Sequence, residues 1–395
     1  MTSAVQSAEV PIVPYASGRV YFDADSHIME TLDWLHSHAT PAEAALINPL
    51  SPKNAGPGVE KAIKIAEARR QSPEATAELL KQPLISGPKG WFAFGASTSQ
   101  ERSRALDLLG FERQLVFPTF ALGQFARSAD EDVVYAGTRA LNRGMGRFCA
   151  EDKRLLPVGF LPLHNAARAL EALDAGLADG VRAFWVSADC AAGRSPAHVD
   201  NEPIWARLAD ARTPVILHIG AGSLAPAGYH NNGRPKPQDW LGGGENLRAR
   251  DWPAAAHAAQ NFLSALTLDG VFERHPQLHC GVIELGGTWV PGFLRLLDHA
   301  AKQFRKSDPL LESLQLTPSE YFKRQVRISL FPFEDAGWLI KDSGEELFMF
   351  ASDYPHPEGG RDPIARFEAS LNAHAIGDAA RERFYSENFR HLMQL

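Results

Sequence analysis

Eight short apolar segments alternate along this chain with longer amphipathic runs, and this alternation limits the folds that the sequence can adopt. Each segment is rich in Val, Ile, Leu or Phe and is followed by a loop of Gly, Pro or polar residues. Such repetition is typical of parallel strands separated by helices. The predicted strands are Val20–Ala24, Arg113–Phe117, Leu155–Phe160, Val181–Val186, Val215–His218, Leu278–Glu284, Val326–Ser329 and Phe348–Ser352.

The runs between these strands have helical character and complete a repeating strand–helix pattern. We therefore predict an α/β fold, a (β/α)8 TIM barrel with its helices outside a parallel core. A doubly wound sheet with more than one core is the alternative. The predicted helices are Glu131–Cys149, Ala166–Leu177, Pro203–Ala211, Asn261–Arg274, Val290–Gln303 and Pro363–Leu371.

The chain of 395 residues fits a single barrel domain that carries insertions. We predict an N-terminal tail over residues 1–19 and one domain over residues 20–395. Insertions are expected after strand 1, at about residues 31–110, and after strand 5, at about residues 221–253. The second insertion is rich in Gly and Pro and has no helical or strand period, so we expect a lid or an arm there.

The first insertion contains three aromatic residues between glycines, at Trp91, Phe92 and Phe94. We predict that they wall a substrate pocket, although a small hydrophobic cluster is the more frequent use of such residues.

The amino-acid composition indicates which kinds of partner the protein binds. The net charge of -7 argues against nucleic acid, and 45% apolar residues are ordinary for a globular enzyme, so we expect a small-molecule substrate. The three cysteines have no metal or disulfide spacing, and neither a signal peptide nor an 18-residue apolar run is visible. We therefore expect a cytoplasmic protein that does not contact a membrane. Trp240 and Trp252 in the second insertion predict a homo-oligomer, most simply a dimer.

Metal-ligand side chains stand at the C-terminal ends of the predicted strands. Asp25 and His27 follow the first strand, His218 closes the fifth, Glu284 closes the sixth and Asp353 follows the eighth. Barrel active sites are built at that face, and histidine or carboxylate is rarely buried by chance. The convergence predicts a metal site, although each residue alone is weak evidence.

These motifs resemble the amidohydrolase superfamily, specifically the amidohydrolase-related branch that includes the aminocarboxymuconate-semialdehyde decarboxylase-like proteins. In that family the first-strand H-x-H pair, the fifth-strand His and the eighth-strand Asp hold the metal. The resemblance thus implies Asp25, His27, His218 and Asp353 as ligands. The matching stretches are 23–30, 217–220, 272–278 with 283–289, and 351–359.

This chain departs from the family pattern at three places. The first-strand pair is D-x-H, which makes the site more anionic, so that iron, manganese and zinc compete more evenly and magnesium is not excluded. The fourth strand has no lysine to be carboxylated as a bridge between two zinc ions. The sixth strand ends in Glu284 where decarboxylase relatives have a histidine, and Glu284 is a candidate bridge between two ions.

Two residues close in sequence to the predicted ligands are further candidates for the metal site. Glu30, three residues after His27, is either a ligand or a carboxylate near a helix N-terminus. His356, three residues after Asp353, is expected to support a ligand or to bind a second ion.

The main functional hypothesis is hydrolysis of a small organic substrate by a metal-activated water, with one zinc or manganese ion. Asp353, Glu284 and His356 are its predicted catalytic residues. The alternative is a dinuclear oxygenase, a hydroxylase with two iron ions or iron plus manganese, because the donor set is rich in carboxylates. Non-oxidative decarboxylation is a further alternative, weakened by the missing sixth-strand histidine.

Overall fold

Eight parallel strands form one curled sheet in the computed structural model, which describes residues 14–50, 58–220, 233–234, 249 and 251–395. Each strand pairs with the next along the chain, in the order β1 to β8. A doubly wound sheet would place its strands out of chain order, so that alternative is wrong. The strands are β1 Phe22–Asp23, β2 Arg113–Val116, β3 Leu155–Phe160, β4 Ala183–Trp185, β5 Val215–His218, β6 Cys280–Ile283, β7 Val326–Ser329 and β8 Phe348–Met349.

Backbone contacts join the last strand of the sheet to the first. The amide of Ala24 donates to the carbonyl of Phe350 at 3.1 Å, and Ser26 forms a parallel bridge with Tyr354. These contacts lie just beyond the ends of β1 and β8. The architecture is therefore consistent with a TIM barrel, in which the C-terminal ends of all strands meet at one face.

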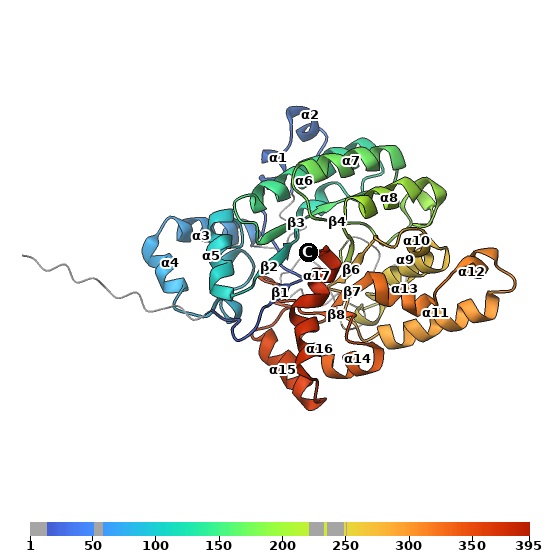
Figure 1. Cartoon of the computed structure of the whole chain (residues 1–395). Coiled ribbons are helices and arrows are strands. Elements are labelled where there is room, and N and C mark those ends of the chain that lie inside the picture. The colour runs from blue at the N-terminus through green and yellow to red at the C-terminus, as the bar shows by residue number, and fades with distance from the viewer. Residues whose placement is uncertain (1–13, 51–57, 221–232, 235–248, 250) are drawn as a thin grey trace, which may run out of the picture.

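Helices surround the sheet on its outside (Figure 1). The longest, α6, buries one side against β3 and has the bounds that the sequence predicted. The helices are α1 Trp34–Ser37, α2 Pro41–Ala44, α3 Val59–Arg70, α4 Pro73–Leu79, α5 Ser99–Leu109, α6 Glu131–Cys149, α7 Ala166–Ala178, α8 Glu202–Asp210, α9 His257–Leu268, α10 Val271–Arg274, α11 Val290–Phe304, α12 Pro309–Ser313, α13 Pro318–Gln325, α14 Ala336–Ser343, α15 Pro363–Ala373, α16 Asp378–Glu382 and α17 Asn388–Met393.

One predicted helix is two helices in the structure. The predicted run Asn261–Arg274 is divided into α9 and α10 by Gly270, whose φ of 74° lies in the left-handed region. Glycine adopts this conformation without the steric cost of a Cβ atom, so it ends one helix and starts the next.

The two predicted insertions differ in how much of them can be described. The first, residues 31–110, contains α1 to α5, and α3, α4 and α5 lie together at one side of the sheet (Figure 1). Nearly all of the second, residues 221–253, and Trp240 with it, lies outside the described residues. Among the helices of the described ranges, none combines the length and apolar character needed to cross a membrane.

The close approach of α6 to the segment after α7 gives a test of the packing. A Cβ atom on Gly146 would lie 2.0 Å from the carbonyl oxygen of Asp179. We expect Gly146→Ala to lower the free energy of unfolding by about 1–3 kcal/mol, measured by thermal unfolding. The matched control is Gly292→Ala in α11. A Cβ atom on Gly292 would have no neighbouring atom within 4 Å outside its own stretch of helix, so alanine should raise the free energy of unfolding by about 0.5–1 kcal/mol. Equal effects of the two substitutions would contradict this packing.

Candidate metal centre

Two groups of buried metal-ligand side chains meet at the C-terminal ends of the strands. The first group is Asp25, His27, His218 and Glu284, and the second is His27, Asp353 and His356. Within each group the ligand atoms lie within 4.8 Å of one another. The strand-end residues singled out in the sequence are thus brought together, with His27 shared by both groups.

Short distances define the first group. The Nε2 atom of His27 lies 3.1 Å from Oδ1 of Asp25, and Nε2 of His218 lies 3.6 Å from the same oxygen. His218 Nε2 is also 3.3 Å from Oε2 of Glu284. Asp25 and Glu284 therefore flank the His218 imidazole, which allows both carboxylates and the imidazole to bind one ion.

The second group adjoins the first through His27. The Nε2 atom of His27 lies 3.7 Å from Oδ1 of Asp353, and Nδ1 of His356 lies 3.1 Å from that oxygen. The amide of Asp353 donates to the carbonyl of Asp25 at 2.9 Å, which fixes the eighth-strand loop against the first.

Hydrogen bonds at the outer nitrogens orient the imidazoles of both groups. His218 Nδ1 contacts the carbonyl of Ile219 at 2.8 Å, and His27 Nδ1 contacts the carbonyl of Pro118 at 3.3 Å. Because a carbonyl only accepts, each Nδ1 carries the proton, and the Nε2 lone pair of each ring faces the carboxylates. Outer-nitrogen hydrogen bonds of this kind are typical of metal-binding histidines.

The electrostatics of the centre favour a bound cation. Burial, followed by the nearby His356, lowers the pKa of His27 to about 3, so its imidazole is neutral at pH 7. A neutral lone pair that faces a carboxylate is unfavourable unless a positive charge lies between the two. The Nε2 atoms of His27 and His218 and both oxygens of Asp353 form no hydrogen bond with any described residue. The donor set therefore fits divalent metal ions.

The backbone is strained at two of these residues. Glu284 has φ 55° and Asp353 has φ 51°, both in the left-handed region that residues other than glycine rarely adopt. Each such residue costs about 1–3 kcal/mol, and strain of this kind is found at functional sites. The strain directs each side chain from the end of its strand toward the centre.

Residues to which the sequence interpretation gave no role hold the ligands in place. The Asp23 carboxylate accepts from the amide and hydroxyl of Ser352 at 2.7 and 2.6 Å and from Nε2 of Gln114 at 2.8 Å. Burial raises the pKa of Asp23 to about 7. Thr119 Oγ1 lies 3.1 Å from Nε2 of His356. The guanidinium of Arg102 donates to the carbonyl of His27. Only burial distinguishes such residues from surface polar ones, and burial is not visible in the sequence.

Glu30 lies outside both ligand groups. Its carboxylate accepts from the amides of Thr119, Phe120 and Ala121, at 2.9 to 3.2 Å, in the loop that follows β2. Burial raises the pKa of Glu30, and these amide donors act against that rise. This geometry matches the second sequence alternative, a carboxylate near the N-terminus of a helical turn.

The two roles of Glu30 can be separated by Glu30→Gln. If the carboxylate only holds the loop, metal content should be unchanged while the free energy of unfolding falls by about 1–3 kcal/mol through weaker amide hydrogen bonds. Elemental analysis and thermal unfolding of the same sample measure both. Loss of metal without loss of stability would restore Glu30 as a ligand.

The three aromatic residues predicted to wall a pocket have different environments. Trp91 stacks on Phe120 with ring centroids 5.0 Å apart and donates its indole N–H to the carbonyl of Glu30. Phe94 is buried, and Phe92 is 43% exposed. Two strand-end aromatic residues, Phe117 and Trp185, pack on the His218 ring at centroid distances of 4.5 and 4.6 Å.

One further cation lies near the centre. Lys89 precedes Trp91 in the chain, and its Nζ atom lies 5.7 Å from the centroid of the Tyr354 ring. Burial lowers the pKa of Lys89 to about 8, and the charges of Asp353 and Glu358 act in the opposite direction.

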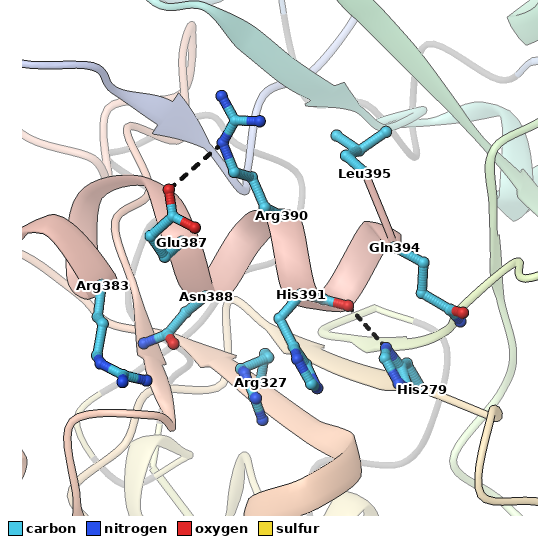
Figure 2. A pocket seen from close by; sticks show the side chains of 9 residues that line it. All are labelled: His279, Arg327, Arg383, Glu387, Asn388, Arg390, His391, Gln394 and Leu395. Atoms are coloured by element: carbon cyan, nitrogen blue, oxygen red, sulfur yellow. Dashed lines mark hydrogen bonds and ion pairs between the residues drawn. The ribbon is translucent and has the colours of Figure 1, made fainter.

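A cavity of about 570 Å³ lies at the other end of the sheet and does not contain the ligands (Figure 2). It is lined by residues at the starts of β6 and β7, such as His279 and Arg327, and by α17. Asn388 of α17 donates to the carbonyls of Glu345 and Phe348, both at 2.8 Å. At this face of a barrel such contacts stabilise the fold, so we do not assign the metal chemistry to this cavity.

Comparison with known proteins agrees with the fold. The sequence model of a family described as Amidohydrolase matches residues 23–392. No curated protein matches the chain. The solved structure of an amidohydrolase from Mycobacterium avium subsp. paratuberculosis K-10 is 21% identical, with a TM-score of 0.72, over 96% of this chain and 99% of that one.

Two solved decarboxylases are also similar. A 2,6-dihydroxybenzoate decarboxylase from Rhizobium is 16% identical over 95% of this chain and 99% of that one, with a TM-score of 0.60. A 5-carboxyvanillate decarboxylase from Novosphingobium aromaticivorans, complexed with manganese, is 17% identical over 96% of this chain and 97% of that one, with a TM-score of 0.60. At these identities the likeness shows a shared fold.

Proposed function

We propose that this chain, which belongs to the amidohydrolase family, hydrolyses a small organic substrate at a centre for two divalent ions. The family match makes it a metal-dependent enzyme; the reaction and the number of ions are our proposal. The observation that carries the proposal is the pair of adjoining ligand groups, whose shared residue His27 would give its one Nε2 lone pair to either ion. Six side chains, three imidazoles and three carboxylates, are more than one ion with an open coordination position needs.

The charge of the ligand groups supports two ions. Asp25, Glu284 and Asp353 contribute three negative charges when ionised, and the histidines are neutral as ligands. One divalent ion would leave a net charge of about -1, and two would leave about +1. A net positive centre is the better electrophile for a substrate carbonyl.

The chain's own residues provide the proton transfer. Bound divalent ions would supply Lewis acidity and lower the pKa of a coordinated water. Burial raises the pKa of Asp353 in the metal-free centre, and its carboxylate is the proton acceptor of the proposed reaction. His356, with Nδ1 3.1 Å from Asp353, orients that carboxylate, and Thr119 holds the other side of the His356 ring. Glu284 and His218 hold the opposite side of the centre.

Dinuclear oxygenation is the second candidate, and the donor set and the aromatic residues around His218 favour it. The donor set is rich in carboxylates, as in di-iron carboxylate proteins. Phe117 and Trp185 give the ligand His218 an apolar surrounding, and such a surrounding limits the access of water. In this alternative the same residues hold two iron ions or iron plus manganese.

Metal analysis together with three assays distinguishes the candidates. Protein purified without added metal is analysed for its elements and then tested for hydrolysis of an ester and amide panel, for oxygen consumption with a reductant, and for carbon dioxide release from aromatic acids. Two equivalents of zinc or manganese with hydrolysis support the proposal. Two iron, or iron plus manganese, with oxygen consumption support the second candidate. Carbon dioxide release alone would mean that the chain shares the reaction named for its decarboxylase neighbours.

A further inference from the structure

Lys89 places a buried ammonium group beside the candidate centre. The amide of the next residue, Gly90, donates to the carbonyl of Pro355 at 2.9 Å, which fixes this segment to the loop after β8. The Nζ atom is buried and forms no hydrogen bond with any residue that the structure describes. The Tyr354 ring beneath it belongs to the same loop as the ligand Asp353. Lys89 is thus a buried ammonium group that interacts with Asp353 and Glu358 through charge and has no hydrogen-bond acceptor among the described residues.

Trp185 places a buried N–H group on the β4 side of the same centre. Its side chain packs on the ligand His218, it is 3% exposed, and its Nε1 atom has no hydrogen-bond acceptor in the described part of the chain. Other indoles of this protein are satisfied: those of Trp91, Trp205 and Trp289 donate to the carbonyls of Glu30, Pro196 and Gly286. Trp185 differs from them and is adjacent to a ligand.

Both groups carry an energetic cost that a bound substrate would relieve. A buried donor without an acceptor costs about 1–3 kcal/mol, and more when the donor is charged. Buried polar groups left unsatisfied in this way are uncommon and often have a binding or catalytic role. The metal-ligand atoms offer only electron pairs, whereas Lys89 and Trp185 offer only protons. Bound ions satisfy the metal-ligand atoms, and a substrate that satisfies Lys89 and Trp185 carries oxygen atoms that accept hydrogen bonds.

We propose that Lys89 and Trp185 are the substrate-binding donors of this centre and that its substrate is a small organic acid. The inference rests on the proposed function and specifies its substrate class. Lys89 binds the carboxylate through its charge, and Trp185 donates to an acceptor oxygen near His218. Lys89 belongs to the first insertion, which is held against the loop after β8, and Trp185 belongs to β4; β8 and β4 are on opposite sides of the sheet order. The acid therefore extends across the strand ends, and the aromatic rings of Phe117 and Trp185 pack against its apolar body.

Binding of benzoate and of its uncharged analogue benzamide tests the proposal. Both are titrated calorimetrically into the full chain loaded with manganese. We expect benzoate to bind at least tenfold more tightly than benzamide. Lys89→Met should abolish this preference, and Lys89→Arg should retain part of it because the charge remains. Trp185→Phe keeps an aromatic ring but lacks the N–H, so it should weaken both compounds by a similar factor.

Matched controls come from the same chain. Lys81→Met removes an exposed ammonium that is paired with Glu78, and Trp289→Phe removes an indole N–H that already has an acceptor. Neither should change the binding of benzoate. Absence of a benzoate preference in the unmodified protein, or a preference that survives Lys89→Met, would overturn the inference. If either result is found while two metal ions remain bound and hydrolysis is intact, the proposed function stands and only the substrate inference fails. If the metal itself is missing from the unmodified protein, the proposed function fails.

Discussion

Replacing His218 with alanine should remove most of the bound metal and all measurable activity. The His218 imidazole stands between the carboxylates of Asp25 and Glu284. Without it, two buried negative charges would face each other with one neutral ligand fewer, and the ion that they share would be held more weakly. The measurements are elemental analysis of the purified variant and the assay that succeeds for the unmodified protein.

The matched control for His218 is His391, a histidine whose ring has a hydrogen-bond partner away from the centre. His391 contacts the carbonyl of Arg324 at 2.8 Å and stacks on His279 at a centroid distance of 4.5 Å, beside the cavity at the far end of the sheet. His391→Ala should leave the metal content unchanged. Full metal occupancy in His218→Ala would refute the assignment of the centre.

Glu284→Gln should halve the metal content if Glu284 is a ligand of one ion in a two-ion centre. Glutamine keeps the shape of the side chain but removes a negative charge. The ion held with Asp25, His27 and His218 should be lost, because Glu284 belongs to that group, and the ion beside Asp353 and His356 should stay. The control is Glu334→Gln, in which the altered carboxylate accepts from the amides of Gly287 and Thr288, both at 2.9 Å, and belongs to neither ligand group. That variant should keep both ions.

The same substitution has two other informative outcomes. If Glu284 is a general acid or base at a one-metal site, Glu284→Gln should keep the metal stoichiometry and lower turnover by about 10²–10⁴-fold. Unchanged metal together with unchanged turnover would remove both roles. Glu284 would then be a structural carboxylate, and the two-ion proposal would fail while the fold stands.

Much of this protein follows from its sequence because the relevant signals are local. A strand is marked by its own apolar residues, so three predicted strands, among them Val215–His218, have the observed bounds. A ligand at a strand end is marked by the polar residue that follows the apolar run, as at Asp25 and His27. Since parallel strands of a barrel end at one face, the sequence also predicted that such residues converge there.

The tertiary structure decided which polar groups near the strand ends face one another. Glu30 follows His27 by three residues, yet its carboxylate contacts amides of the loop after β2. Lys89 and Trp185 are far apart in sequence, and burial alone reveals that each lacks an acceptor among the described residues. Sequence spacing determines which side of a strand a side chain occupies. Its partners come from other strands and loops, whose positions are set by the packing of the whole barrel.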